Sequence, residues 1–500
     1  MKKIKSIILG TATALVMFSS CSDWLDVNPR SEVKESILFS TEDGFKKALT
    51  GAYILTAKSD LYGENTSMYM PELFARHWTF PTDPTDLMNR LSNFDYTQSG
   101  AESLIGNVWL SYYKVIVQLN DILQNLDDAK VNFANNNDDL IRGEALGLRA
   151  FLHFDLLRYF GPVPSGNDLS AIAIPYVMEK TKDPSKLISI PYSEVIQKIE
   201  ADLNAAEQLL EGVDPILRYS NITLNSPAYA NSEGLSDSWH WFRQERFNYY
   251  ACLGTKARFY QWTGNNEKAV NYAKKVIEAV NSDNTSTFTL TKETDYVYSS
   301  TVNLTMRNEQ LFGIQNPDLQ STARSLFDDG TSTTLTQTVT NMNNCYENSV
   351  NASDIRYKPT NNATRYWEEK TYQNSVRVNH FRKYTGNDLI RANNIVPILR
   401  LAEMYLILIE NLPLDEAATY FATYRAARGL NISTEASSMA NDPARMARLE
   451  KEYRKEFFGE GQMFFFYKRL NYKAYTWPAS YTLPVGAYVV PKPKAQLSFE

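Results

Sequence analysis

Histidine, cysteine and long apolar runs are all scarce in this chain of 500 residues. It contains only 4 His and 3 Cys, which argues against a zinc cluster and against a fold held by disulfides. No GxSxG sequence occurs, and Gly459-Glu460-Gly461 lacks the third glycine of a dinucleotide-binding loop. We therefore expect no catalytic residues, no metal site and no cofactor.

An excess of positive charge is also missing. The formal net charge is −6, and Lys2, Lys3 and Lys5 lie in a segment that we expect to be removed. Without them, 48 basic side chains stand against 57 acidic ones, a net charge of −9. Such a chain is a poor match to a polyphosphate, so we expect no nucleic-acid partner. With 43% hydrophobic and 22% charged residues, the composition is that of a soluble globular chain with a sizeable core.

The first twenty residues have the order of a secretion signal. Basic residues precede an apolar run from Ile7 to Phe18, which is too short to span a bilayer. Ser19 and Ser20 then lead into Cys21, an arrangement that resembles the lipobox of bacterial lipoproteins. Residues 1–20 are therefore predicted to be a removed signal peptide, with Cys21 acylated and residues 21–40 forming a lipidated tether. The alternative is an ordinary signal peptide followed by an incidental cysteine.

Several segments carry apolar residues at helical spacing and stop at glycine or proline. The helix predicted over 142–161 ends at Gly161 and Pro162, and residues 109–126 are predicted to pair with it. Further helices are predicted over 251–265, from Ala269 to Val280, from Pro397 to Leu412, from Ala417 to Ala427 and from Asp442 to Phe457. The pattern predicts a mainly α fold of about four tetratricopeptide-like helical hairpins, within about 105–212, 247–282 and 397–460, which support a loop-rich half with a few short strands.

Three long stretches lack the helical period. Residues 60–104, 213–246 and 285–395 are rich in Asn, Thr, Ser, Tyr and Trp. Strands are predicted from Gln310 to Ile314, and strand-like alternation runs from Ser286 to Thr291. No linker-like segment divides the chain, so residues 41–500 are predicted to form a single domain whose long loops are functional.

Aromatic residues make up 13% of the chain and are the best candidates for ligand contacts. A sugar presents flat faces of C–H groups edged by hydroxyls, so it suits exposed aromatic rings beside polar side chains on loops. The candidate ligand-binding residues are Arg76, Trp78, Asp83, Tyr96, Trp239, Trp241 and Trp367. The alternative is that these rings cover the helical scaffold from outside, as we expect for Trp109 and Trp262 within the helices.

Other chemistry-bearing residues have structural interpretations. Glu452, Glu456 and Glu460 are spaced by four and could be an acid–base pair, but the lysines and arginines among them favour a solvated, salt-bridged helix face. His153 is expected in or near the core, and Cys252 is expected to be a buried thiol.

Seven motifs in order along the chain resemble the SusD/RagB-like outer-membrane lipoproteins of Bacteroidetes. They are CSDWLDVNPRSEV (21–33), RGEALGLRAFLHFDLLRYFG (142–161), ARFYQWTGN (257–265), NEQLFGIQ (308–315), SDIRY (353–357), PILRLAEMYLILIENL (397–412) and EYRKEFFGEGQMFFFYKRL (452–470). The run Met463 to Tyr467 departs from the family's Trp-Phe-Asp-Leu type, and Leu406 to Glu410 departs from its usual Arg-Ala-Glu. Both departures affect packing and put the subfamily, not the fold, in question.

The resemblance implies four tetratricopeptide-like units, a variable ligand face and a partner, a SusC-like TonB-dependent outer-membrane barrel on which the chain acts as a hinged lid. It implies a non-enzymatic, surface-exposed lipoprotein, anchored in the outer membrane, that binds an oligosaccharide ligand and delivers it to that transporter. The same lid role for peptides or another nutrient is the first alternative. A surface glycosidase and a purely structural cap are the others.

Overall fold

The computed structural model describes residues 35–166, 168–296, 303–328, 334–357, 366–371, 377–385, 390–430, 439–498 and 500. The predicted signal peptide and Cys21 lie outside these residues. None of the helices in the described part combines the length and the apolar character needed to cross a bilayer.

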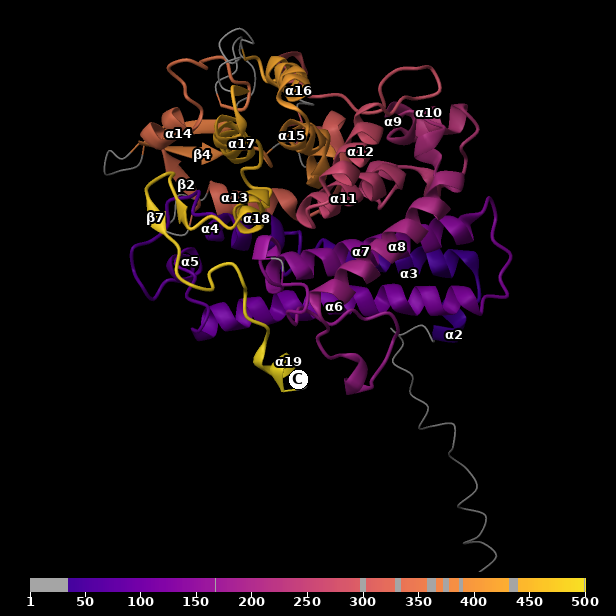
Figure 1. Ribbon diagram of the computed structural model, residues 1–500. Helices are drawn as coiled ribbons and strands as arrows, with labels where there is room; N and C mark the ends of the chain where they lie inside the picture. The colour runs from indigo at the N-terminus through magenta and orange to yellow at the C-terminus, as the bar shows by residue number, and fades with distance from the viewer. Residues whose placement is uncertain are drawn as a thin grey trace, which may run out of the picture.

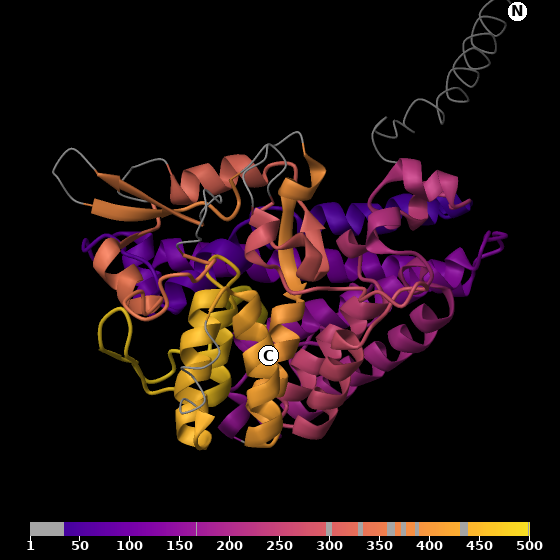
Figure 2. The ribbon, with the colours of Figure 1, turned by 90° about the horizontal axis from the view of Figure 1, so that it is seen from above.

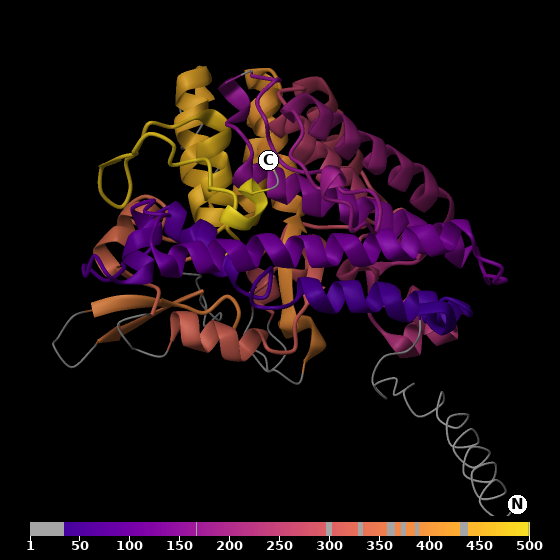
Figure 3. The ribbon, with the colours of Figure 1, turned by 90° about the horizontal axis from the view of Figure 1, so that it is seen from below.

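Long helices form the base of the molecule. Helix α3 (Glu42–Thr56) lies beside α6 (Ser99–Asp127), and in the view of Figure 3 α6 runs across most of the molecule with α3 along one half of it. Helix α7 (Asn137–Phe160) turns back on α6 and is covered by α8 (Tyr192–Val213). Because α7 is buried on nearly every side, its polar residues need internal partners. Arg149 of α7 accordingly donates to the carboxylate of Asp202 of α8 at 2.7 and 2.8 Å.

Three further helix pairs extend this base (Figure 1). They are α11 (Tyr249–Trp262) with α12 (Asn266–Ile277), α15 (Leu401–Asn411) with α16 (Leu414–Ala427), and α17 (Asp442–Glu456) with α18 (Gln462–Leu470). Local signals set their ends: Asn248 caps α11 by accepting from the N–H of Ala251, and Asn441 caps α17 by accepting from the N–H of Ala444. The prediction of a mainly α fold built from helical hairpins is confirmed.

The other helices are short. They are α2 (Glu35–Leu38), α4 (Met70–Phe74), α5 (Leu87–Ser92), α9 (Asn221–Leu224), α10 (Pro227–Ser232), α13 (Leu319–Phe327), α14 (Val339–Cys345) and α19 (Lys494–Leu497). Most of them lie in the stretches that sequence analysis leaves without helical period.

The strands belong to the loop-rich half. Strand β1 (Gln310–Gln315) is antiparallel to β5 (Ile395–Arg400), and β2 (Thr336–Thr338), β4 (Arg377–Phe381) and β3 (Trp367–Thr371) form a sheet in that order. Strands β6 (Ala474–Tyr475) and β7 (Tyr481–Thr482) make a small hairpin. Figure 2 shows the three-stranded sheet and α13 on one side of the long helices, with α15 to α18 on the other.

Two strand predictions have different outcomes. The strand from Gln310 to Ile314 is confirmed as β1. The alternating run from Ser286 to Thr291 forms no described strand and has only an isolated bridge between Val280 and Ser286. Pro397 is not the first residue of a helix, because it lies in β5 opposite Gly313 and the helix begins at Leu401.

A buried network of charges joins the helix pairs to β1 and β5. Glu456 accepts from Arg400 at 2.7 Å, from Arg428 at 2.8 Å and from Arg356 at 3.1 Å. Burial alone would raise the pKa of Glu456, but the three guanidiniums hold it well below its usual range. The network also includes Asp354, Glu309, Glu452, Glu460 and Lys383. We call this set the interior network.

The interior network corrects the prediction for the three glutamates. Glu452, Glu456 and Glu460 are salt-bridged as expected, but all three are buried and none forms a solvated face. The physical reason is that Arg356, Arg400 and Arg428 reach these glutamates from other parts of the chain and cover them. Glu460 lies beyond the end of α17, in the turn before α18. His153, Trp109 and Trp262 lie in the core as expected, and Cys252 and Cys345 are buried free thiols.

Candidate functional site

The structure places Trp78 and Trp367 in the core. Trp78 is 1% exposed and Trp367 is 2% exposed, and their ring centroids are 5.6 Å apart. The ring of Phe381 from β4 packs on both, and the indole N–H of Trp78 donates to Glu72 at 2.8 Å. The prediction that these rings contact ligand is therefore corrected: Trp367 is the first residue of β3, and both rings are almost completely buried against each other and against Phe381.

The other candidates near α4 and α5 serve local structure. The hydroxyl of Tyr96 is buried and donates to the carbonyl of Ala487 at 2.7 Å, so the structure also corrects its assignment to ligand contact. Arg76 is half-buried and donates to the carbonyl of Ser92. Asp83 is exposed and accepts from the N–H and hydroxyl of Thr85, as in a turn. Helix α5 and strand β7 lie at one end of the molecule and α9 and α10 at the other (Figure 1), so these residues do not join the tryptophans near α10.

Trp239 and Trp241 lie on a loop that is firmly held. Asp237 caps the short helix Ser238–His240 by accepting from the N–H of Trp239 at 2.9 Å. The indole N–H of Trp241 donates to the carbonyl of Leu235 at 2.8 Å. Phe242 then adopts a φ of 54°, a left-handed conformation that is rare for a bulky residue and concentrates at functional sites.

The next residue anchors this turn. Arg243 is fully buried and donates to both carboxylate oxygens of Asp214 at 2.9 and 3.0 Å, and it also pairs with Glu144. Burial would lower the pKa of Arg243, but these two carboxylates raise it above its ordinary value. The ion pairs of Arg243 thus fix the strained turn at Phe242. They also fix the backbone next to the half-buried Trp241.

Trp241 lines a cleft of about 150 Å³ between this loop, α3 and the end of β1. Tyr53, Trp241, Phe242, Glu245, Arg246 and Arg391 supply its aromatic and charged lining. We call it the Trp241 cleft. Trp241 is half-buried, so part of its ring can contact a ligand. It is the one predicted aromatic that keeps this freedom while lining a described cavity.

Trp239 does not line the cleft but packs against Arg246, which does. Its ring is buried, with the guanidinium of Arg246 3.7 Å from its centroid and the ammonium of Lys46 5.9 Å from it. Its assignment as a ligand contact is therefore corrected to a positioning role for Arg246.

Arg246, Arg391, Phe242 and Tyr53 are the residues that sequence analysis missed. Arg246 follows the two tryptophans closely, so an arginine near an aromatic cluster was a signal that could have been used. Arg391 is 146 positions from its partner Glu245, and nothing local connects them. Its guanidinium lies 4.2 Å from the centroid of the Phe242 ring.

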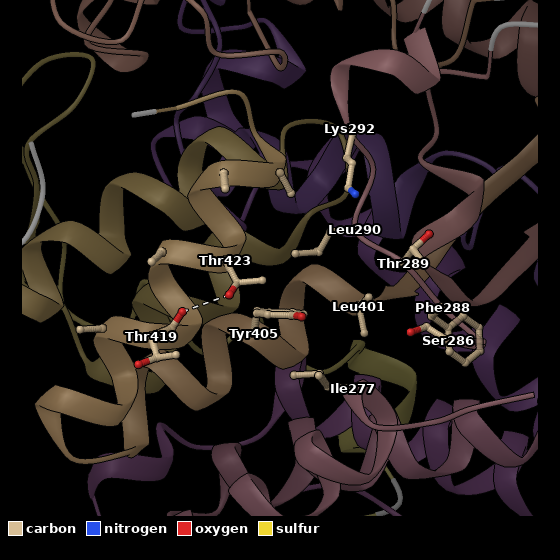
Figure 4. Close-up of a pocket in the computed structure, with 14 residues that line it drawn as sticks. Ile277, Ser286, Phe288, Thr289, Leu290, Lys292, Leu401, Tyr405, Thr419 and Thr423 are labelled. Atoms are coloured by element: carbon tan, nitrogen blue, oxygen red, sulfur yellow. Dashed lines mark hydrogen bonds between the residues drawn. The ribbon is translucent and has the colours of Figure 1, made fainter. Parts of the chain in front are cut away.

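A larger groove lies on the helical side of the molecule. Its volume is about 860 Å³, and its apolar walls include Ile277, Leu290, Leu401 and four alanines of α16, which are Ala418, Ala422, Ala426 and Ala427. Figure 4 shows Thr423 turned toward Thr419, whose carbonyl accepts its hydroxyl at 3.1 Å. Lys292 is the only charged side chain among its described lining residues. This α16 groove has one half-buried aromatic ring, Tyr405, and its other polar groups are an ammonium and the hydroxyls of serine and threonine side chains.

Comparisons with known proteins point to one family. Residues 23–230 match the SusD-like family model described as "Starch-binding associating with outer membrane". The SusD-like proteins P38 and P2 of Formosa agariphila are 25% and 24% identical over 227 and 213 residues, which cover 45% and 42% of this chain. Residues 23–230 of the chain are thus similar to the SusD-like family.

Solved structures show the same fold over almost the whole chain. A SusD superfamily protein from Bacteroides thetaiotaomicron aligns with a TM-score of 0.69 at 17% identity, over 92% of this chain and 98% of that one. A putative sugar binding protein from Bacteroides vulgatus gives a TM-score of 0.67 at 18% identity, over 92% and 97%. The sequence alignments, by contrast, span about two fifths of the curated relatives, 41% of P38 and 38% of P2.

The described residues contain no group of His, Cys, Asp and Glu side chains that could hold a metal ion. The side chains that gather in the Trp241 cleft are instead a ring face, hydrogen-bond donors and one carboxylate. That set suits reversible recognition of a polar ligand with an apolar face.

Proposed function

We propose that this protein is a non-enzymatic, surface-exposed outer-membrane lipoprotein that binds oligosaccharides in the Trp241 cleft. In this proposal, residues 1–20 are removed, Cys21 is acylated, and residues 41–500 act as one domain. The bound glycan is passed to a SusC-like TonB-dependent barrel on which the protein closes as a lid. The family description, which joins starch binding to association with the outer membrane, supports the general role.

The single observation that carries glycan binding is Trp241. A half-buried indole on a rigid turn, with Glu245 and Arg391 lining the same cleft, offers a sugar a stacking surface and hydrogen-bonding groups together. The cleft is smaller than the roughly 300–1,000 Å³ of pockets that enclose a drug-sized ligand. It therefore holds one residue of the glycan, and the rest of the chain lies on the surface outside.

Calorimetry tests this proposal on the mature chain with Cys21→Ser, against a panel of oligosaccharides. We expect a dissociation constant in the micromolar range, about −8 kcal/mol. Trp241→Ala should weaken binding about tenfold, because the stacking surface is lost. Tyr229→Ala on α10 is the matched control, since that ring is exposed and outside the cleft, and it should leave binding unchanged.

The alternatives give different results. Equal affinities for Trp241→Ala and the unchanged chain would contradict the site, and binding of peptides with no glycan binding would favour the other nutrient class. Release of cleavage products on long incubation with the panel would contradict a role limited to binding.

A further inference from the structure

The Trp241 cleft holds an arginine that lacks a hydrogen-bond acceptor. Among the described residues, no guanidinium nitrogen of Arg246 forms a hydrogen bond, although its side chain is only 18% exposed. The closest carboxylate oxygen, Oε2 of Glu144, is 3.7 Å away and already accepts from the hydroxyl of Tyr53 at 2.7 Å. The other oxygen of Glu144 accepts from Arg243. A desolvated guanidinium without a close acceptor is costly unless a ligand supplies one.

The position of Arg246 is nevertheless fixed. Its guanidinium stacks on Trp239, and the Tyr53 ring centroid is 5.7 Å away. Stacking on aromatic faces orients the guanidinium plane without using its N–H groups. The structure thus holds hydrogen-bond donors in place and leaves them unused.

Arg391 adds a second positive charge to the same lining. Its side chain is 49% exposed, and it pairs with Glu245, which is almost completely buried. Arg307 also approaches Glu245, with Nη2 3.3 Å from Oε1. Glu245 is the only carboxylate among the described lining residues of the cleft, and its charge is shared by two arginines within the wall.

The acidic residues at the edge of the cleft do not reverse this balance. Asp237 and Glu42 both pair with Lys46, at 2.9 and 2.8 Å. Asp214, beneath the turn, is matched by Arg243. Behind the lining, Glu144 is shared by Arg243 and Arg246. Among the described residues that line the cleft itself, two guanidiniums, those of Arg246 and Arg391, accompany one carboxylate, that of Glu245.

We infer that the Trp241 cleft selects glycans that carry an anionic group, a uronic acid carboxylate or a sulfate ester, which Arg246 and Arg391 bind while Trp241 stacks on the sugar ring. Arginine binds both groups through paired N–H donors. This inference rests on the proposed function, because it takes glycan binding at the cleft as given and names the class of glycan.

Two matched ligand pairs test the selection by calorimetry on the mature chain with Cys21→Ser. The carboxylate pair is tetragalacturonate and its methyl ester, and the sulfate pair is a carrageenan tetrasaccharide and its desulfated form. The charged member of at least one pair should bind about tenfold more tightly than its neutral partner in low salt, and which pair responds identifies the group. The advantage should shrink in about 0.5 M NaCl, because exposed charges are screened.

Arg391→Gln is the informative variant, since Glu245 keeps Arg307 as a partner. It should weaken binding of the charged ligand about fivefold and leave the neutral one within about twofold. Arg382→Gln is the matched control, because Arg382 is similarly exposed and also pairs with a glutamate, Glu368, at 2.9 Å. It should change neither affinity.

Three results would overturn the inference. They are equal binding of charged and neutral partners in both pairs, an equal loss of both ligands in Arg391→Gln, and an effect of Arg382→Gln as large as that of Arg391→Gln. In each case the glycan site itself survives. If no member of either pair and no glycan of the wider panel binds, the proposed function fails, and the selection fails with it.

Discussion

The interior network and the Trp241 cleft are both built from arginines, glutamates and aromatic rings, but they differ in how the charges are matched. In the network, Arg356, Arg400 and Arg428 are fully buried and each pairs with at least two carboxylates. In the cleft, Arg246 has no hydrogen-bonded carboxylate among the described residues, and Arg391 is half exposed. Charges that are matched and buried hold elements together, and they have no donors left for a ligand. The cleft arginines are only partly paired, so they keep N–H donors that a ligand can use.

The largest expected effect comes from breaking the network at its centre. Glu456→Ala leaves three arginines without their shared carboxylate, and removing one partner of a buried pair costs about 3–5 kcal/mol. We expect the free energy of unfolding to fall by about 5 kcal/mol, because three partners are affected. Chemical denaturation followed by circular dichroism measures this change.

Glu368→Ala is the control for that prediction. Its pair with Arg382 is exposed on both sides, and such pairs contribute about 0–1 kcal/mol. A loss for Glu456→Ala no larger than that of Glu368→Ala would show that the network does not stabilise the fold, and the contrast with the cleft would disappear.

Trp78→Ala extends the comparison from charges to aromatic rings. Trp78 packs against Phe327, Phe381 and Phe458, and its removal leaves a cavity in the core. Unfolding free energy should fall by about 4 kcal/mol, while glycan affinity at a temperature where the variant is folded should not change. The opposite pattern, normal stability with lost affinity, would restore Trp78 as a ligand contact. Thermal unfolding and calorimetry on the same sample distinguish the two.

The parts of the fold that sequence analysis predicted are those with local causes. Helix α11 has a capping Asn248 and ends just before Gly264, and β1 lies in a run with strand character, so short windows contain the information. The burial of Glu456 has no local cause. Its partners lie 28, 56 and 100 positions away, and spacing by four along α17 shows that glutamates share a face without showing what covers it.

The same limit applies to the candidate site. The sequence pattern placed Trp367 and Trp241 outside the long helices, but it could not separate Trp367, which is buried in the core, from Trp241, which is half-buried beside a cleft. The charge in the cleft depends on Arg391 meeting Glu245 across 146 positions. Only the folded chain brings them together.

Replacing Glu72 gives the smallest of the three stability effects. It tests a buried carboxyl group that, unlike those of the interior network, has no arginine or lysine partner among the described residues. Glu72 is a buried carboxylate with no ion pair among the described residues, and it accepts from the indole N–H of Trp78 and from the N–H of Gly461, both at 2.8 Å. Burial raises the pKa of Glu72 to about 7, even though these hydrogen bonds lower it. In the unfolded chain the carboxyl has its ordinary pKa of about 4.5.

The sign of the pH dependence follows from these two values. Between about pH 4.5 and 7 the folded state keeps the proton that the unfolded state has released, so stability falls as pH rises through this window. At about 1.4 kcal/mol per unit of pKa, the total loss is about 3 kcal/mol. Buried histidines such as His153, whose pKa burial lowers to about 3, contribute the opposite slope.

Glu72→Gln removes the carboxyl and leaves the histidines, so the difference in unfolding free energy between the unchanged chain and this variant isolates Glu72. That difference should fall by about 3 kcal/mol from about pH 4.5 to about pH 7.5. A constant difference across the range would mean that Glu72 stays ionised in the core without an ion pair.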